Sequence, residues 1–213
     1  MSRELPILFN TEMVRAILDG RKDATRRIVK DFIPDDAVWG YTAFTHKGYI
    51  SCRGTFADGD GEKFFKLPCE PGDILYVRET WKKAPNGYYY YEDWQRNDIA
   101  DITKWKPSIH MPKEAARIWL KVTDVRVERL QEITYNGALR EGSQGIRCDH
   151  VALGVHGCTD CMNTGWIEPP QVEFMQIWND TIKKSDIDRY GWDANPWVWV
   201  IEFERCEKPT EMR

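Results

Sequence analysis

The strongest constraint on the fold is an alternation of apolar and charged residues from Arg117 to Leu130. Alternation with a period of two is the pattern of a strand that has one buried face. The apolar series changes phase near Asp124, which predicts a bulge or bend at that point. Its members are Ile118, Leu120 and Val122, followed by Val125 and Val127. The chain therefore has a long strand near its middle.

Shorter patterns predict further strands and helices around this one. We expect strands at Pro6–Phe9, at Ile74–Val77 after the Pro71-Gly72-Asp73 turn, and at Trp197–Phe203, which is apolar enough to be buried on both sides. We expect a helix at Met13–Leu18, capped by Asn10 or Thr11 and ended by Gly20, and another at Val172–Ile182. A short helix should begin at Thr134 and end near Glu141-Gly142.

Size and charge narrow the class of protein. A chain of 213 residues can bury a hydrophobic core of good size. We expect one domain, residues 1–206, followed by a disordered tail at 207–213. The domain should carry insertions near 35–68, 84–105 and 143–170. The net charge of -4 argues against a general binder of polyanions. No apolar run could span a bilayer and the start does not resemble a signal peptide, so we expect a cytoplasmic protein without a membrane partner.

The stretch Leu18–Ile28 carries four cations, a threonine and a glycine, and it is the first candidate site. Lys22 and Thr25 are three residues apart, so in a turn or bent loop their side chains could face one small volume. A lysine whose charge is suppressed by burial can take a proton from a threonine hydroxyl and so activate a nucleophile. The alternative is a solvated basic loop whose arginines pair with nearby carboxylates.

A second group of candidates follows the predicted strand at Ile74–Val77. Arg78 and Glu79 could bind the polar edge of a ligand on which Trp81 stacks, or they could pair with neighbours while Trp81 belongs to the core. His110, in the loop Pro107–Pro112, could carry protons or donate to a base. The run Tyr88–Tyr91 could stack on single-stranded bases, but the acidic residues around it favour a hairpin that packs on the rest of the domain.

Cysteine and histidine residues near position 150 form a candidate metal site. Six cysteines at uneven spacing do not make a disulfide framework. Cys158 and Cys161 have the spacing of a zinc knuckle, and Cys148 with His150 or His156 could complete a tetrahedral set. We therefore expect a structural zinc ion and no organic cofactor, with a redox C-x-x-C pair as the alternative.

Eight segments together resemble a known family. Pro6–Phe9, Met13–Lys22 and Thr25–Arg27 look like the opening of an ASCH-domain protein of the PUA-like superfamily, in the branch found in phages and prophages. Five later segments resemble that branch too: Pro71–Trp81, Pro107–Pro112, Arg117–Leu130, Glu141–Gly142 and Asn195–Phe203. The resemblance implies an α+β fold built on a mixed or antiparallel PUA-like β-barrel with short flanking helices, here with the zinc-binding loop added. A phage protein would act in the cytoplasm of a bacterial host.

The resemblance also implies an activity. Some small bacterial ASCH proteins are N4-acetylcytidine amidohydrolases, and their catalytic lysine, threonine and glutamate match Lys22, Thr25 and Glu141. Arg21, Arg26 or Arg78 could stabilise the oxyanion. The sequence departs from the relatives at Asp23, where a hydroxyl residue is common, and a carboxylate beside Lys22 would keep the lysine charged.

Two other functions fit the same residues. In the first, the protein binds RNA, DNA or a modified base without catalysis, and Arg26, Arg27 and Arg78 contact phosphates or a base edge. In the second, the protein is a ribonuclease whose cations stabilise a phosphorane. The expected partners are accordingly a nucleoside, a modified base or single-stranded nucleic acid.

Overall fold

The computed structural model describes residues 2–95, 97, 103–149, 159 and 165–209. The described strands are β1 (Glu4–Leu8), β2 (Ala24–Ile28), β3 (Val38–Gly40), β4 (Tyr49–Arg53), β5 (Glu62–Lys66), β6 (Ile74–Arg78), β7 (Trp81–Ala84), β8 (Gly87–Tyr90), β9 (Trp119–Arg129), β10 (Ile146–Arg147), β11 (Trp166–Glu168) and β12 (Trp197–Cys206). The helices are α1 (Thr11–Leu18), α2 (Tyr91–Gln95), α3 (Tyr135–Arg140), α5 (Pro170–Thr181) and α6 (Ile187–Tyr190), together with short 3-10 turns. The predicted α+β class is confirmed.

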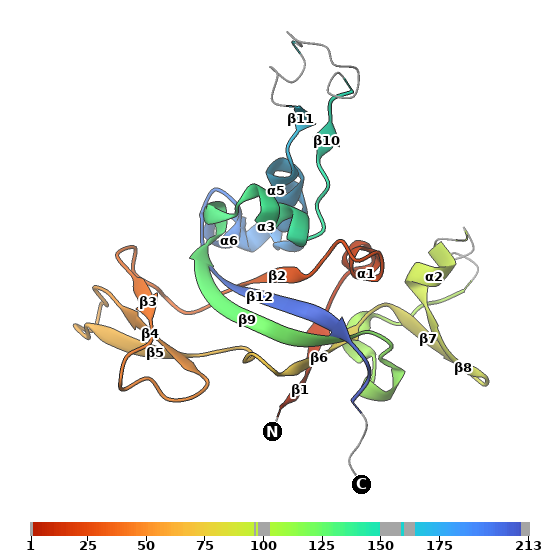
Figure 1. Ribbon diagram of the computed structural model, residues 1–213, viewed down its shortest axis with the longest axis horizontal. Coiled ribbons are helices and arrows are strands. Elements are labelled where there is room, and N and C mark those ends of the chain that lie inside the picture. Colours follow the sequence, from red (N-terminus) through yellow and green to blue (C-terminus); the bar gives the residue numbers. More distant parts are fainter. Residues whose placement is uncertain (1, 96, 98–102, 150–158, 160–164, 210–213) are drawn as a thin grey trace.

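The central sheet has the strand order β1-β6-β9-β12-β2 (Figure 1). Only β1 and β6 are parallel, and every other neighbouring pair is antiparallel. The long strand predicted from the alternation is β9, and it pairs with β12 along its whole length. Glu202 pairs with Asp124 but Phe203 pairs with Val122, so Thr123 has no partner on β12. This irregularity is the predicted break beside Asp124 and allows both halves of β9 to bury their apolar residues.

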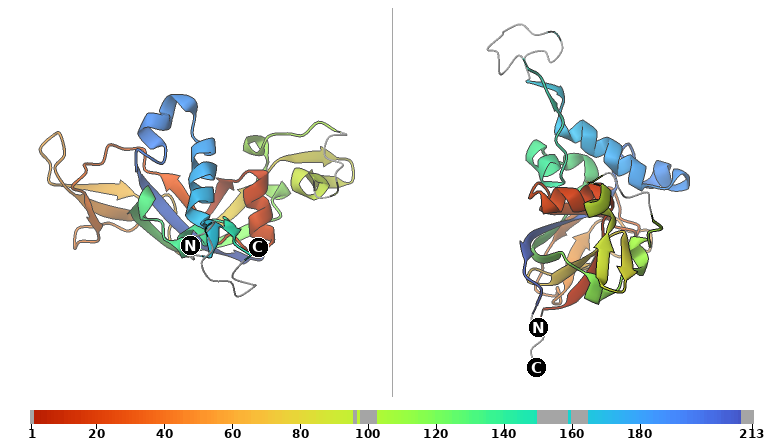
Figure 2. Two further views of the ribbon diagram at one scale, coloured as in Figure 1. Left: turned by 90° about the horizontal axis from the view of Figure 1, so that it is seen from above. Right: turned by 90° about the vertical axis from the view of Figure 1, so that its right-hand side faces the viewer.

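Apolar residues cover both faces of the central sheet. The larger cluster lies on the face with Trp199, Ile201 and Phe203 and includes Val14 and Ile17 of α1. The smaller cluster joins Val198 and Val200 to Phe174 and Trp178 of α5. Helices α3 and α5 lie side by side over this second face (Figure 2). β12 is therefore buried on both sides, as its sequence predicted.

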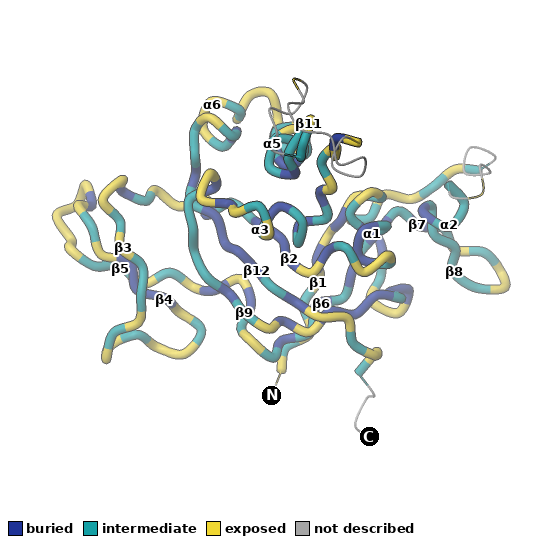
Figure 3. Tube along the Cα trace, turned by 45° about the horizontal axis from the view of Figure 1, so that its top comes forward, coloured by how far each residue is buried: buried dark blue, intermediate teal, exposed yellow. Residues whose placement is uncertain are grey.

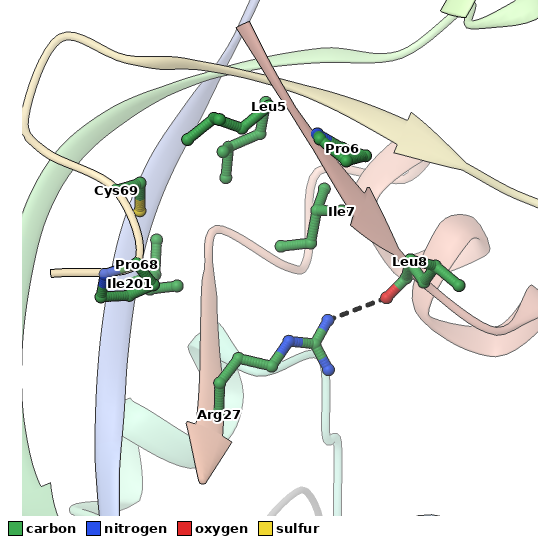
Figure 4. A pocket seen from close by; sticks show the side chains of 9 residues that line it. Leu5, Pro6, Ile7, Leu8, Arg27, Pro68, Cys69 and Ile201 are labelled. Atoms are coloured by element: carbon green, nitrogen blue, oxygen red, sulfur yellow. Dashed lines mark hydrogen bonds between the residues drawn. The ribbon is translucent and has the colours of Figure 1, made fainter. Parts of the chain in front are cut away.

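The described strands do not close into the barrel that the resemblance implied. β1 and β2 are the two edges of the central sheet, and no ladder joins them. Pro6 in β1 has no N–H group to donate to a neighbouring strand. The side chain of Arg27 spans the gap instead, where its Nη2 donates to the carbonyl oxygen of Leu8 at 2.8 Å (Figure 4). A side chain between the edge strands thus replaces the backbone pairing of a closed barrel.

Besides the short β10-β11 ladder, two smaller β units lie on opposite sides of the central sheet in the described part of the chain (Figure 1). One is the antiparallel sheet β3-β4-β5, within the predicted insertion 35–68. The other is the β7-β8 hairpin, where Trp81, Tyr88 and Tyr90 pack with Met111 and Trp119, as the hairpin interpretation of the tyrosine run predicted. Burial is concentrated in the central sheet and in the helices on it, while the loops of the outlying units are exposed (Figure 3). Among the described helices, none is both long and apolar enough to cross a membrane.

Candidate functional site

The end of α1 directs Lys22 into the protein. Asn10 caps the helix by accepting from the N–H of Met13, and Gly20 follows it with a φ of 73°. The N–H groups of Arg21 and Lys22 both donate to the carbonyl oxygen of Ala16, at 2.8 and 3.0 Å. This tight turn places Lys22 inside the molecule, where only 3% of its surface is exposed. The solvated basic loop considered above therefore does not describe Lys22.

Lys22 meets Glu141 across 119 residues of sequence. Its Nζ donates to Oε2 of Glu141 at 2.6 Å, to the carbonyl oxygen of Glu141 at 2.9 Å and to that of Ala24 at 2.8 Å. Both side chains are almost fully buried. The ammonium group thus has three acceptors for its three hydrogens.

Glu141 is placed by the end of α3. Thr134 caps this helix by accepting from the N–H of Gly137, and Glu141 is the C-cap residue that directly follows Arg140. Gly142 then takes a φ of 98°, and a Cβ at this position would lie 2.8 Å from the Cβ of Ala16. Glycine therefore allows the ends of α1 and α3 to approach closely enough for Glu141 to reach Lys22.

Arg26 binds the same carboxylate from another direction. Its Nη1 lies 3.2 Å from Oε1 of Glu141, and its Nη2 lies 3.1 Å from Oε2 of Glu128. The guanidinium is buried and also contacts the ring of Phe174. Sequence reasoning missed Glu128 as a partner, although the alternation along Arg117–Leu130 placed it among the polar positions of that strand. One carboxylate therefore serves two buried cations.

Thr25 lies beside this group on the edge strand β2. It pairs with Ile201 of β12 and is 1% exposed. Its side chain lines a small cavity of about 30 Å³ together with Arg26, Arg27 and Glu141. Within the described part of the chain, the Thr25 hydroxyl has no hydrogen-bond partner. The hydroxyl is thus available to a ligand that enters this cavity.

Opposing effects act on the pKa of Lys22. Burial lowers the pKa, the ion pair and hydrogen bond with Glu141 raise it, and the charges of Arg27 and Arg26 lower it again. The net direction is below the ordinary lysine value, because desolvation of a fully buried ammonium outweighs one carboxylate that is shared with Arg26. This direction is the one that a lysine base requires.

Asp23 does not act on Lys22 as the sequence led us to expect. Its side chain is exposed and accepts from Nε of Arg140 at 2.7 Å. Neighbouring side chains in extended backbone point in opposite directions, so Lys22 faces inward while Asp23 faces outward. The carboxylate that holds Lys22 is that of Glu141.

A larger cavity of about 360 Å³ adjoins the small one. The two share Met13, Glu141, Ile177 and Thr181 in their walls. Arg21 also lines the larger cavity and is bound to Asp19 and to the carbonyl oxygen of Gly142. Three further carboxylates, of Glu12, Glu173 and Asp180, line it as well. This acidic wall does not favour a phosphate group.

The second group of predicted residues serves other contacts. Arg78 donates to the carbonyl oxygens of Ile109 and Met111, and Glu79 forms a double ion pair with Arg117, with both distances 2.9 Å. Trp81 is buried in the core of the hairpin unit, and His110 is exposed. None of the described side-chain contacts joins these four residues to Lys22, Thr25 or Glu141. Because Arg78 is bound to the carbonyl oxygens of the loop Pro107–Pro112, it does not stabilise an oxyanion formed at Thr25.

The zinc prediction lies mostly beyond the described residues. Cys148 is described and buried, whereas His150, His156, Cys158 and Cys161 lie outside the described ranges. Among the residues that are described, no three His, Cys, Asp or Glu side chains could together hold a metal ion. Zinc binding here stays a prediction.

Comparison with known proteins does not assign the chain to a family. No model of a known protein family matches it, and no solved structure matches it. One similar curated protein is oxysterol-binding protein homolog 7 of Saccharomyces cerevisiae, which is 28% identical over 96 residues. The match covers 42% of this chain and 22% of the yeast protein.

Proposed function

We propose that this chain is an ASCH-type amidohydrolase of the PUA-like superfamily that removes an acyl group from the N4 amide of a cytosine base or nucleoside. The observation that carries the proposal is the buried contact of 2.6 Å between Lys22 and Glu141, with Thr25 on the wall of the adjoining cavity. These three residues are the ones that match the catalytic residues of the N4-acetylcytidine amidohydrolases. The geometry supports the proposal because Glu141 contacts Lys22 and lines the same cavity as Thr25, although it is far from both in sequence.

The reaction follows from the chemistry of the three side chains. Lys22, in its neutral form, accepts the proton of the Thr25 hydroxyl as the hydroxyl oxygen attacks the acyl carbonyl. The C–N bond of the amide then breaks, the cytosine amine leaves with a proton delivered through Glu141 or Lys22, and an acyl ester remains on Thr25. Water hydrolyses this ester and releases the carboxylic acid. The positive charges of Lys22, Arg26 and Arg27 stabilise the oxyanion of both steps.

The two adjoining cavities offer room for such a substrate. The larger one is of the size that holds a small organic ligand, while the smaller one beside Thr25 is too small for a base. Met13 lies between them, and its flexible side chain can move to join the two spaces. The acidic lining favours an uncharged base or nucleoside over a phosphorylated one.

A second candidate is a module that binds a modified base without hydrolysing it. The observation in its favour is that all three hydrogens of the Lys22 ammonium have acceptors. In this protonated state the nitrogen has no lone pair with which to accept a proton from Thr25. Catalysis requires Lys22 to lose a proton and one of these bonds, whereas binding does not. Binding should therefore survive removal of the Thr25 hydroxyl, and hydrolysis should not.

The experiment is detection of cytidine released from N4-acetylcytidine by mass spectrometry. Wild type should turn over, Lys22→Met and Thr25→Val should lose at least about 100-fold in rate, and Thr25→Ser should keep part of it. Thr123→Val, at an exposed threonine of β9, is the matched control and should behave as wild type. If the folded wild type releases no cytidine but binds the nucleoside equally well with and without the Thr25 hydroxyl, the second candidate holds.

A further inference from the structure

An apolar cleft lies between the two edge strands of the central sheet and shares Arg27 with the small cavity beside Thr25. Its volume is about 290 Å³. Leu5 and Ile7 come from β1, Leu75 from β6 and Ile201 from β12, and Pro68 and Cys69 are also part of the wall (Figure 4). The cleft exists because β1 and β2 do not pair, so it is a consequence of the open sheet.

Among the described residues that line this cleft, one is charged. Arg27 extends from β2 toward β1 and donates through Nη2 to the carbonyl oxygen of Leu8 (Figure 4). Its guanidinium also lies 5.1 Å from the centre of the Phe9 ring. Among the described residues it has no ion pair, and this one hydrogen bond is its only one. Four of its five N–H donors are therefore unused.

The surroundings of Arg27 make an anion its natural partner. The carboxylate of Glu141 acts on Arg27 from a distance, but that group is bound by Lys22 and Arg26. Arg27 is half-buried, and it lacks a carboxylate of its own. A guanidinium binds a carboxylate through two parallel hydrogen bonds, which is the strongest way to satisfy such a group.

We propose that this cleft binds a small amphipathic carboxylate, with its carboxylate on Arg27 and its hydrocarbon chain against Leu5, Ile7 and Ile201. The volume lies at the lower limit of ligand pockets and fits a short chain of the length of octanoate. The apolar wall requires a ligand whose other end is hydrocarbon. The proposal does not depend on hydrolysis at Thr25.

The test is an NMR titration of the full chain, labelled with ¹⁵N, with octanoate and with octanamide. Octanamide has the same chain and nearly the same shape but no charge. Octanoate should bind saturably in the millimolar range and shift the amide signals of Leu5, Ile7, Cys69 and Ile201. Octanamide should bind about tenfold to 100-fold more weakly, as expected for loss of a charge-assisted pair.

Three variants assign the site. Arg27→Gln should abolish the preference for octanoate over octanamide, and Arg27→Lys should retain part of it. Leu5→Trp, at a half-buried position of β1, should block the cleft and weaken both probes while leaving the signals around Glu141 unchanged. Equal affinity for the two probes in wild type, shifts confined to other residues, or no saturable binding of octanoate would each overturn the proposal.

Discussion

Lys22 and Glu141 form a buried ion pair, with Nζ 2.6 Å from Oε2, that fastens the loop after α1 to the end of α3. The other oxygen of Glu141 accepts from Arg26 at 3.2 Å. The carboxylate of Glu141 is thus the shared counterion of two cations. Its removal would leave Lys22 and Arg26 buried without this negative charge. The stability of the fold and the protonation of Lys22 therefore depend on the same residue.

Replacement of Glu141 by glutamine should destabilise the protein strongly. Removing one partner of a buried pair costs roughly 3–5 kcal/mol, because an uncompensated charge is left behind. Urea denaturation at neutral pH measures the change. Asp23→Asn is the control, since the ion pair of Asp23 with Arg140 is exposed and should contribute less than about 1 kcal/mol. Similar losses in both variants would mean that the Glu141 carboxylate has no special role.

The pKa of Lys22 predicts a dependence of stability on pH. Burial lowers this pKa below the unfolded value of 10.5, so between the two values the folded state binds fewer protons than the unfolded state. The free energy of unfolding supplied by Lys22 therefore rises with pH across that window. Chemical denaturation at several pH values should show this component in wild type and lose it in Lys22→Met. Parallel curves for the two proteins would contradict the lowered pKa.

The sequence predicted most of the central sheet because its signals are local. Alternation identified β9 and the break beside Asp124, and the turn at Pro71-Gly72-Asp73 located β6. Asn10 and Gly20 likewise marked the two ends of α1. These features depend on residues close together in the chain, which is why a single sequence contains them.

The remaining features depend on residues far apart in the chain. Whether β1 and β2 form a ladder depends on residues at the two edges of the central sheet. The side chain of Arg27 lies between these edges. The predicted effect of Asp23 on Lys22 is wrong because residues adjacent in sequence can place their side chains on opposite sides of the chain. The contact between Lys22 and Glu141 was expected only through the family resemblance, since nothing local connects them.

Gly142 provides a test of how closely α1 and α3 must approach. Alanine at this position should add a clash with Ala16 to the strain of a positive φ. Gly20→Ala is the matched control, because its φ is 73° but no atom lies within 4 Å of the added Cβ. We expect Gly142→Ala to be less stable than Gly20→Ala by about 1–3 kcal/mol in urea denaturation. Equal stabilities would show that the helix ends have room to separate.

The charge of Arg27 should contribute to the pH at which hydrolysis begins. Arg27 lowers the pKa of Lys22, so Arg27→Gln should raise that pKa and move the rising limb of kcat/KM to higher pH. The measurement is the rate of cytidine release across a pH series. Arg53→Gln, at an exposed arginine of β4, should leave the profile in place. An unshifted profile in Arg27→Gln would contradict an electrostatic coupling between Arg27 and the group that titrates.

The most direct test of the proposed mechanism is to stop the reaction with N4-acetylcytidine in acid during the first turnover and map the acetyl group on the protein. The mechanism predicts one acetyl group on Thr25 in wild type, with cytidine formed in equal amount, and neither product in Thr25→Val. Release of cytidine by Thr25→Val at the wild-type rate would contradict it.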